Sequence, residues 1–316
     1  MQPLLINPTR RLEPSKISYR GMVPPPAGLG ARRMRLEILA LFRIFTGQKL
    51  KVSKRLVSQG IPLKTEDRLQ EEAAPGKRTV YEEEYVRQLF DTIAPRYDLL
   101  NHILSSGIDI LWRKKAIRLL RAYQPKRILD VATGTADLAM EAARLKPDSI
   151  LGIDIAPQML KIGREKIRRK NLGHRITLEV GSAETLPVPD KSFDAVTVAF
   201  GVRNFSNLKQ GLSEMRRVLK SGGVAMILEF SLPRRAPIKQ LYRFYFRQIL
   251  PWIGGWISRS KEAYRYLPST VAQFPDGQEF CTILRSVGFT GIKTFPLTLG
   301  IATIYLAHIS NEEVEQ

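Results

Sequence analysis

Cysteine and histidine are scarce in this chain of 316 residues. The single cysteine, Cys281, excludes an internal disulfide and any metal site built from several cysteines. The three histidines, His102, His174 and His308, are too widely spaced to form a zinc motif. We therefore expect no metal site, and the low cysteine content fits a reducing, cytoplasmic setting.

Long hydrophobic runs are missing as well, since none reaches the about 18 uncharged apolar residues that a membrane-spanning helix needs. Acidic residues are scarce at the N-terminus: residues 1–60 hold 12 Lys and Arg against 2 Asp and Glu, which accounts for half of the net charge of +20. The rest of the chain is basic, but less so than a dedicated nucleic-acid binder. An anionic membrane surface suits this charge equally well.

Residues 1–80 differ from the rest of the chain. They contain three consecutive prolines at 24–26, few acids before Glu66, and a basic, apolar piece over residues 34–45. We predict a disordered basic extension. A transit peptide and a helix lying on a membrane over residues 34–45 are the alternatives.

A strand, a turn and a helix follow one another from residue 127. An apolar run over residues 127–131 passes through Thr133, Gly134 and Thr135 into a helix-forming segment. A second apolar run ends twenty positions after Gly134, on Asp154. An acid at the end of the second strand can accept hydrogen bonds from both ribose hydroxyls, and Gly134 lets the backbone approach a ligand closely. The pattern predicts an α/β protein that binds a nucleoside.

The turn indicates which nucleoside. A dinucleotide site needs G-x-G-x-x-G, whereas this turn has one glycine between two threonines and is followed by Asp137. A carboxylate there would repel a pyrophosphate but would suit a ligand with an amino group and a sulfonium, such as S-adenosylmethionine (SAM). An ordinary strand–turn–helix unit with a surface acid is the alternative.

Strands and helices alternate from residue 127 to Pro233, which predicts a parallel sheet with helices on both faces. The final pair of strands has a short connection and must run antiparallel, as in SAM-dependent methyltransferases. Helices over 82–120, broken at Ala94-Pro95 and at 105–107, precede the sheet and can act as a lid. The predicted strands cover 127–131, 149–154, 175–180, 193–199, 224–230, 291–296 and 300–308, and the predicted helices 136–145, 156–170, 207–219 and 276–286.

Several segments together resemble one family. They are RILDVATGTAD (127–137), GID (152–154) with QML (158–160), GSAETLP (181–187), FGVRN (200–204) and YRYL (264–267), with YDLLN (97–101) and WR (112–113) upstream. These segments resemble the UbiE/MenG quinone C-methyltransferases over roughly residues 85–308. The first turn is typical of the whole superfamily, whereas the FGVRN and YRYL segments are much more specific.

The resemblance implies a class I SAM-dependent methyltransferase (Rossmann-like) fold over residues 81–310, with a helical lid (81–122) and an apolar insertion (234–270). It implies SAM as methyl donor and a polyprenylated quinol as acceptor, with demethylmenaquinol converted to menaquinol. A 2-methoxy-6-polyprenyl-benzoquinol is the alternative acceptor. The expected cofactor-binding residues are Thr135, Asp154, Ser182 and Ala183, together with Gly134 and Asp130. Ala132, Thr133 and Ala136 stand where the family often has more glycine.

Methylation of a ring carbon requires the phenolate form of the quinol. Arg203 is a poor proton acceptor, so we expect it to stabilise the phenolate directly or through a water; a salt-bridging arginine is the alternative. Asn204 is expected to hydrogen-bond a quinol oxygen, and Tyr97 to orient the ring or relay a proton, unless its role is structural. His102 is a better base by its pKa, provided that the lid folds over the pocket.

The last expectations concern the prenyl tail, the membrane, the oligomeric state and the rival functions. Residues 241–257 are expected either to pack on the core or to form a flap that grips the prenyl tail and touches the bilayer. We expect a cytoplasmic enzyme that contacts the inner face of the membrane, assembles as a homodimer and binds no nucleic acid, because the Asn/Asp-Pro-Pro-aromatic segment of base methyltransferases is missing after the fourth strand. The rival functions are a nucleic-acid methyltransferase, a SAM-binding scaffold without catalysis, and a small-molecule O- or N-methyltransferase, which differs only in the acceptor atom.

Overall fold

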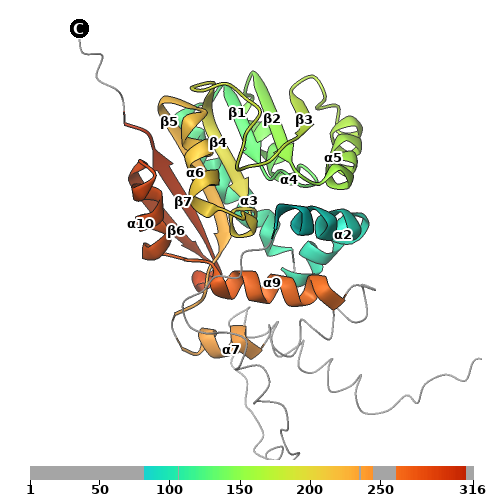
Figure 1. Ribbon diagram of the computed structural model, residues 1–316, viewed down its shortest axis with the longest axis vertical. Helices are drawn as coiled ribbons and strands as arrows, with labels where there is room; N and C mark the ends of the chain where they lie inside the picture. Colours follow the sequence, from blue (N-terminus) through green and yellow to red (C-terminus); the bar gives the residue numbers. More distant parts are fainter. Residues whose placement is uncertain (1–81, 106, 235, 245–260, 311–316) are drawn as a thin grey trace, which may run out of the picture. The chain divides into compact units, whose positions relative to one another are not determined.

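The computed structural model describes residues 82–105, 107–234, 236–244 and 261–310. The predicted N-terminal extension and most of the predicted flap lie outside these residues. The described part forms a seven-stranded sheet in the order β3-β2-β1-β4-β5-β7-β6 (Figure 1). The strands are β1 (Arg127–Val131), β2 (Ser149–Asp154), β3 (Ile176–Val180), β4 (Phe193–Ala199), β5 (Leu219–Phe230), β6 (Thr290–Leu297) and β7 (Ala302–His308).

Strands β1 to β5 pair in parallel, and β7 pairs antiparallel with both β5 and β6. The prediction of a mostly parallel sheet with a C-terminal antiparallel hairpin is confirmed. The parallel strands are apolar runs because both faces of the sheet are covered. Strand β5 begins at Leu219, five residues earlier than predicted, because Leu219 still pairs with Phe193 before the register shifts.

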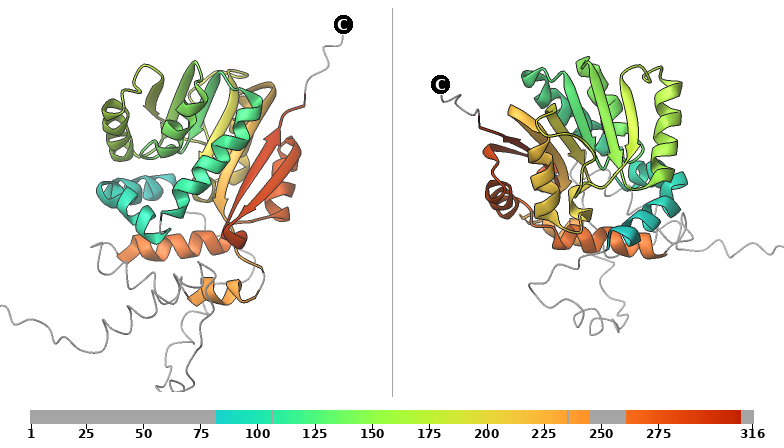
Figure 2. Two further views of the ribbon diagram at one scale, coloured as in Figure 1. Left: turned by 180° about the vertical axis from the view of Figure 1, so that it is seen from behind. Right: turned by 45° about the horizontal axis from the view of Figure 1, so that its top comes forward.

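Helices cover the two faces in separate layers (Figure 2). One face packs α3 (Ile108–Leu120), α4 (Asp137–Ala142) and α5 (Pro157–Arg169) on side chains such as Ile128 and Ile150. The other face packs α6 (Leu208–Arg217) and α10 (Gln278–Ser286) on Leu129 and Val196. The alternation of in- and out-facing residues along each strand thus serves two apolar cores.

Helix α2 (Glu83–Leu104) and helix α9 (Lys261–Gln273) lie beside the carboxyl ends of the parallel strands (Figure 1). The predicted break at Ala94-Pro95 is wrong, since α2 runs through Pro95 for 22 residues. Proline removes one helical hydrogen bond, but buried Val86, Leu89 and Ala94 anchor the turns of the helix that precede it. The predicted break at 105–107 agrees with the end of α2 and the left-handed Gly107 (φ 74°).

Helix α7 (Ile238–Phe244) is the helix described in the connection between β5 and α9. Within the described ranges, no helix has the length and apolar character to cross a bilayer.

Candidate active site

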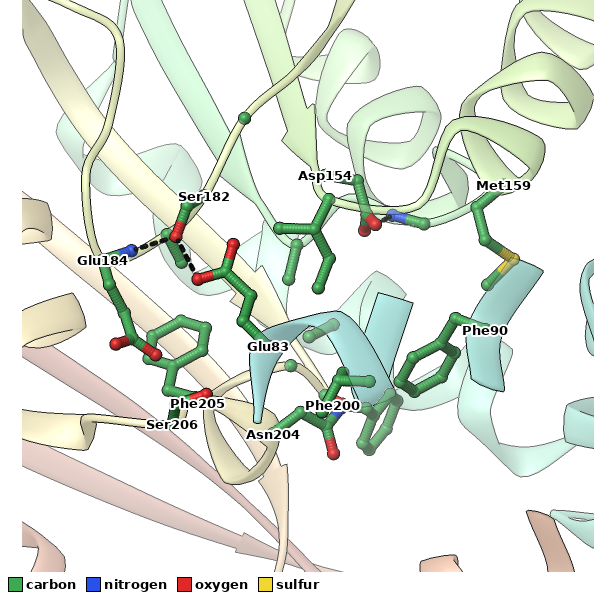
Figure 3. Close-up of a pocket in the computed structure, with 18 of the residues that line it drawn as sticks. Glu83, Phe90, Asp154, Met159, Ser182, Glu184, Phe200, Asn204, Phe205 and Ser206 are labelled. Carbon is green, nitrogen blue, oxygen red and sulfur yellow. Dashed lines mark hydrogen bonds between the residues drawn. The ribbon is translucent and has the colours of Figure 1, made fainter. Parts of the chain in front are cut away.

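A cavity open to solvent lies between the carboxyl ends of the strands and α2 (Figure 3). Such a position is where α/β folds bind their ligands. The sheet side of the cavity is formed by the loops that follow β1, β2, β3 and β4, and the helical side by α2. Of the predicted site residues, those that line the cavity are Gly134, Asp154, Ser182, Ala183, Asn204 and Tyr97.

The first turn, after β1, has an unusual backbone. Ala132, Gly134 and Ala136 have φ values of 50°, 55° and 64°. Only glycine adopts this left-handed region without steric cost. Ala132 and Ala136 therefore adopt a conformation that suits glycine, and the turn has its shape at a cost in strain.

Asp154 links the end of β2 to the first turn. Its Oδ2 accepts a hydrogen bond from the backbone N–H of Gly134 (2.8 Å), and its Oδ1 accepts one from the N–H of Ala156 (2.9 Å). These two donors fix the carboxylate at the cavity wall, where its other lone pairs can accept from a ribose diol. Burial raises the pKa of Asp154 to about 6, against the opposing effect of the two N–H groups.

Asp130 supports the turn from below and does not line the cavity. Its buried carboxylate accepts hydrogen bonds from Thr133 Oγ1 (2.5 Å) and Thr197 Oγ1 (2.7 Å). Burial raises the pKa of Asp130 to about 6. The expectation that Asp130 contacts the cofactor therefore changes to a supporting role, because both its oxygens are held by the threonines under the turn.

The side chain of Thr135 is also directed away from the cavity. Its hydroxyl donates to Asp98 of α2 (2.6 Å) and accepts from Lys166 Nζ of α5 (3.1 Å). Lys166 pairs with Asp98 (2.8 Å) and with Asp137, which also pairs with Arg113 at 3.4 Å. Asp137 thus pairs with two cations, and the suitability of its carboxylate for the amino group and sulfonium of SAM stays a prediction.

Ser182 and Ala183 lie in the loop after β3, the strand that neighbours β2 on the side away from β1. The Ser182 hydroxyl donates to Glu83 of α2 (3.0 Å) and accepts from the backbone N–H of Glu184 (3.1 Å), as Figure 3 shows. Sequence reasoning missed Glu83. The helix dipole favours an acidic residue in the first turn of any helix. Nothing in the local sequence therefore marks Glu83 as a site residue.

Arg203 lies in the short 3-10 helix η4 (Val202–Asn204), and only 7% of it is exposed. Its guanidinium pairs with buried Glu229 of β5 (2.7 Å) and donates to the carbonyl of Phe200. Arg203 is not among the residues that line the cavity. The alternative of a salt-bridging arginine describes this position, because a buried carboxylate needs a counter-charge.

Asn204 and Tyr97 line the cavity from opposite sides. The amide oxygen of Asn204 accepts from the hydroxyl of Tyr266 on α9 (3.0 Å). The ring of Tyr97 packs edge-on against Phe90, at 5.9 Å between centroids. Tyr266 belongs to the YRYL segment, but its contact with Asn204 could not be foreseen from the sequence. The side chain of His102 lies outside the described residues.

The cavity fits SAM. It presents a tight backbone turn, the carboxylate of Asp154, which can accept from a ribose diol, and the polar Ser182-Ala183 loop. The loop after β4 approaches the turn so closely that a Cβ at Gly201 would lie 2.7 Å from that of Ala132. No group of three metal-ligating side chains occurs in the described part of the chain.

The fold is that of the class I SAM-dependent methyltransferases. A putative S-adenosyl-L-methionine-dependent methyltransferase from Methanococcus maripaludis superposes with a TM-score of 0.51, covering 72% of this chain and 96% of that one at 18% identity. This likeness confirms the predicted fold class.

The family follows from the sequence comparison. The model of the ubiE/COQ5 methyltransferase family matches residues 78–309, and the chain belongs to this family. It is 49% identical to the ubiquinone/menaquinone biosynthesis C-methyltransferase UbiE of Geotalea uraniireducens, over 71% of this chain and 95% of that protein. It is 44% identical to the demethylmenaquinone methyltransferase of Bacteroides fragilis, over 75% and 98%. The protein is a SAM-dependent methyltransferase, and the predicted family and cofactor are confirmed.

Proposed function

We propose that this enzyme transfers the methyl group of SAM to a ring carbon of a polyprenylated quinol, and that it converts demethylmenaquinol to menaquinol. The observation that carries this proposal is the 44% identity to a demethylmenaquinone methyltransferase over 98% of that protein. One relative is named for both ubiquinone and menaquinone biosynthesis. A polyprenyl-benzoquinol is therefore the second candidate acceptor. When bound, SAM supplies an electrophilic methyl group.

Asn204 binds the reacting oxygen of the quinol. Its Oδ1 is held by Tyr266, while its Nδ2 has a long contact of 3.5 Å with the carbonyl of Phe200. The amide N–H₂ therefore has hydrogen-bonding capacity for a quinol oxygen in the cavity. A donor at this point favours the phenolate, which raises the electron density on the adjacent ring carbon.

Arg203 acts as a positioning residue for Asn204. Glu229 accepts both from the guanidinium of Arg203 and from its backbone N–H (3.3 Å). The same guanidinium donates to the Phe200 carbonyl, so that η4 is held to the end of β4 and to β5. Asn204 is next in the chain, and the buried pair fixes its backbone.

Aromatic side chains form the wall against which the quinol ring packs. Phe90 and Tyr97 of α2 and Phe200 after β4 all line the cavity. Rings provide a large apolar contact for a planar quinol and exclude water from the phenolate. Tyr97 orients the substrate ring from the α2 side.

The enzyme works in the cytoplasm against the inner face of the membrane, where its substrate is dissolved. Leu111 at the start of α3 is 62% exposed, and Leu299 in η6 (Thr298–Gly300) is 74% exposed. A hydrogen bond from Trp112 Nε1 to Thr298 Oγ1 (2.8 Å) joins the two elements beside these leucines. Two exposed leucines held by neighbouring elements are suited to an apolar boundary.

Basic residues extend this surface along α3. Lys114, Lys115 and Arg118 are exposed and follow Leu111 at helical spacings of three, four and seven residues. Anionic headgroups attract such a row. Sedimentation with phosphatidylglycerol vesicles should fall when Leu111 and Leu299 are both changed to serine, whereas binding to vesicles of neutral lipid stays low throughout. Equal sedimentation of the variant and the native protein would contradict this contact.

The reaction is tested by incubating purified protein with labelled SAM and a panel of reduced quinones. We expect methyl transfer to demethylmenaquinol, with NMR locating the new methyl group on a ring carbon. Transfer to an oxygen, or to a nucleic acid instead of any quinol, would contradict the proposal. Binding of SAM without transfer to any quinol would favour a non-catalytic scaffold.

A further inference from the structure

Glu83 is the first residue of α2, and its carboxylate lies in the cavity beside the loop after β3 (Figure 3). Its Oε2 accepts a hydrogen bond from the hydroxyl of Ser182, at 3.0 Å and across 99 residues of sequence. The neighbouring acid, Glu84, turns to a different set of partners, Arg87 and Gln88. Two acids at the same helix end therefore have separate surroundings, and Glu83 is the one that lines the cavity.

The adenine of SAM extends toward this end of the cavity. Asp154 at the end of β2 takes the ribose, and the methyl group has to point toward Asn204, which follows β4. In the sheet, β3 lies on the far side of β2 from β1 and β4. The base is thus left with the loop after β3, which contains Ser182 and Ala183.

The hydrogen bonds already made in this loop decide what the base meets there. The single hydrogen of the Ser182 hydroxyl is used on Glu83, and one of its lone pairs accepts from Glu184 N–H. Ser182 therefore holds the carboxylate and has no hydrogen left for the base. The carboxylate of Glu83 has several lone pairs and can accept further hydrogen bonds.

We propose that Glu83 is a specificity-determining residue of the cofactor site, whose carboxylate accepts a hydrogen bond from the 6-amino group of the adenine. The inference rests on the proposed placement of SAM in this cavity. A base with a 6-oxo group in place of the amino group presents an oxygen to the carboxylate, and the two acceptors repel each other. The site thereby selects adenine nucleosides over their deaminated counterparts through a residue of the lid helix.

Calorimetry with two ligands tests this role: S-adenosyl-L-homocysteine and its 6-oxo analogue S-inosyl-L-homocysteine. The carboxylate of Glu83 is exposed, so its contribution is that of one hydrogen bond, and we expect the native enzyme to prefer the adenosyl ligand by about tenfold. In Glu83→Gln the preference should be lost, since the amide N–H₂ can donate to the 6-oxo group. In Glu83→Ala the adenosyl ligand should bind about threefold to tenfold more weakly.

Glu84→Gln is the matched control, since it removes the same charge from the same helix turn and should leave both affinities unchanged. Thermal melting shows that each variant is folded. If Glu83→Gln lowers the affinity for both ligands equally, Glu83 holds the lid helix. If both affinities stay as in the native enzyme, Glu83 does not meet the base. Either result overturns the inference. Failure of the native enzyme to bind S-adenosyl-L-homocysteine would instead contradict the cofactor site itself.

Discussion

The sheet side and the helical side of the cavity are built by different means. On the sheet side, backbone N–H groups of Gly134 and Ala156, which follow β1 and β2, fix the carboxylate of Asp154 at the end of β2. On the helical side, the rings of α2 and the contacts that α9 makes with the loop after β4, such as Tyr266 with Asn204, define the wall. We therefore expect the ribose and methionine parts of the cofactor to meet a surface set by the sheet, whereas the acceptor meets one set by contacts between distant elements.

The sequence separations of these contacts explain what could be predicted. Gly134 and Asp154 are 20 residues apart, within one strand–helix–strand unit whose geometry is general. The partners on the helical side are 62 residues apart for Asn204 and Tyr266, and 99 for Ser182 and Glu83. Strand periodicity therefore located the ribose carboxylate, but no local pattern could pair a serine with an acid on the lid.

The same reasoning explains the changed interpretation of Arg203. Its place after β4 was predictable from the apolar run before it, and a residue at a strand end often faces the ligand. Its counter-charge, Glu229, is 26 residues further on and directly follows the apolar run of β5, one residue before the strand ends. A buried acid in that strand needs a cation beside it, and Arg203 is that cation. Its guanidinium is therefore bound to Glu229, and Arg203 does not line the cavity.

The largest effect should come from breaking this ion pair. Arg203→Met leaves Glu229 charged and buried without its guanidinium, which should lower the free energy of unfolding by about 3–5 kcal/mol in denaturant titrations. The double variant Arg203→Met with Glu229→Gln should recover part of this loss, because no unpaired charge remains. A stable Arg203→Met protein that binds cofactor but lacks turnover would instead restore a direct role of Arg203 with the phenolate.

Asp154→Asn tests the sheet side with the next largest effect. The amide keeps one acceptor but loses the charge, and affinity for S-adenosyl-L-homocysteine should fall about 100-fold by calorimetry, since hydrogen bonds to a charged group are involved. Asp148→Asn makes the same change at an exposed position before β2. It should bind normally, and a comparable loss there would show that the effect is one of overall charge.

Tyr266→Phe tests the helical side alone. Without the hydroxyl, the amide of Asn204 loses the contact that fixes its orientation, and kcat should fall about tenfold, the effect of one misplaced hydrogen bond. Affinity for S-adenosyl-L-homocysteine should stay unchanged, because Asp154 and the first turn are not touched. Tyr123→Phe, whose hydroxyl contacts His308 at 3.2 Å, is the control. Loss of cofactor affinity in Tyr266→Phe would mean that the two sides are not independent.

The pH dependence of cofactor binding provides a second test of Asp154 on the sheet side. The ribose hydroxyls need the ionised form of Asp154, whose pKa is raised by burial to about 6. Affinity should therefore be constant above pH 7, fall as the pH is lowered through 6, and be about tenfold weaker at pH 5. The profile should be flat in Asp154→Asn. A slope that persists in this variant assigns the titration to Asp130, which titrates in the same range.

The smallest effect concerns the strain in the first turn. Ala132 has a left-handed φ of 50°, so Ala132→Gly should raise the free energy of unfolding by about 1 kcal/mol, the steric cost of a Cβ in this region. Ala143, at the end of α4, has a right-handed φ of −58°, and the same substitution there should lower stability by about 0.5–1 kcal/mol or more through added chain entropy and lost packing. Opposite signs for one substitution, measured by thermal melting, would attribute the stabilisation to the backbone of the cofactor turn; equal signs would show that the alanine is not strained. If strain is relieved without a change in cofactor affinity, the turn owes its shape to the sheet and to Asp154, and glycine at this position is a matter of stability alone.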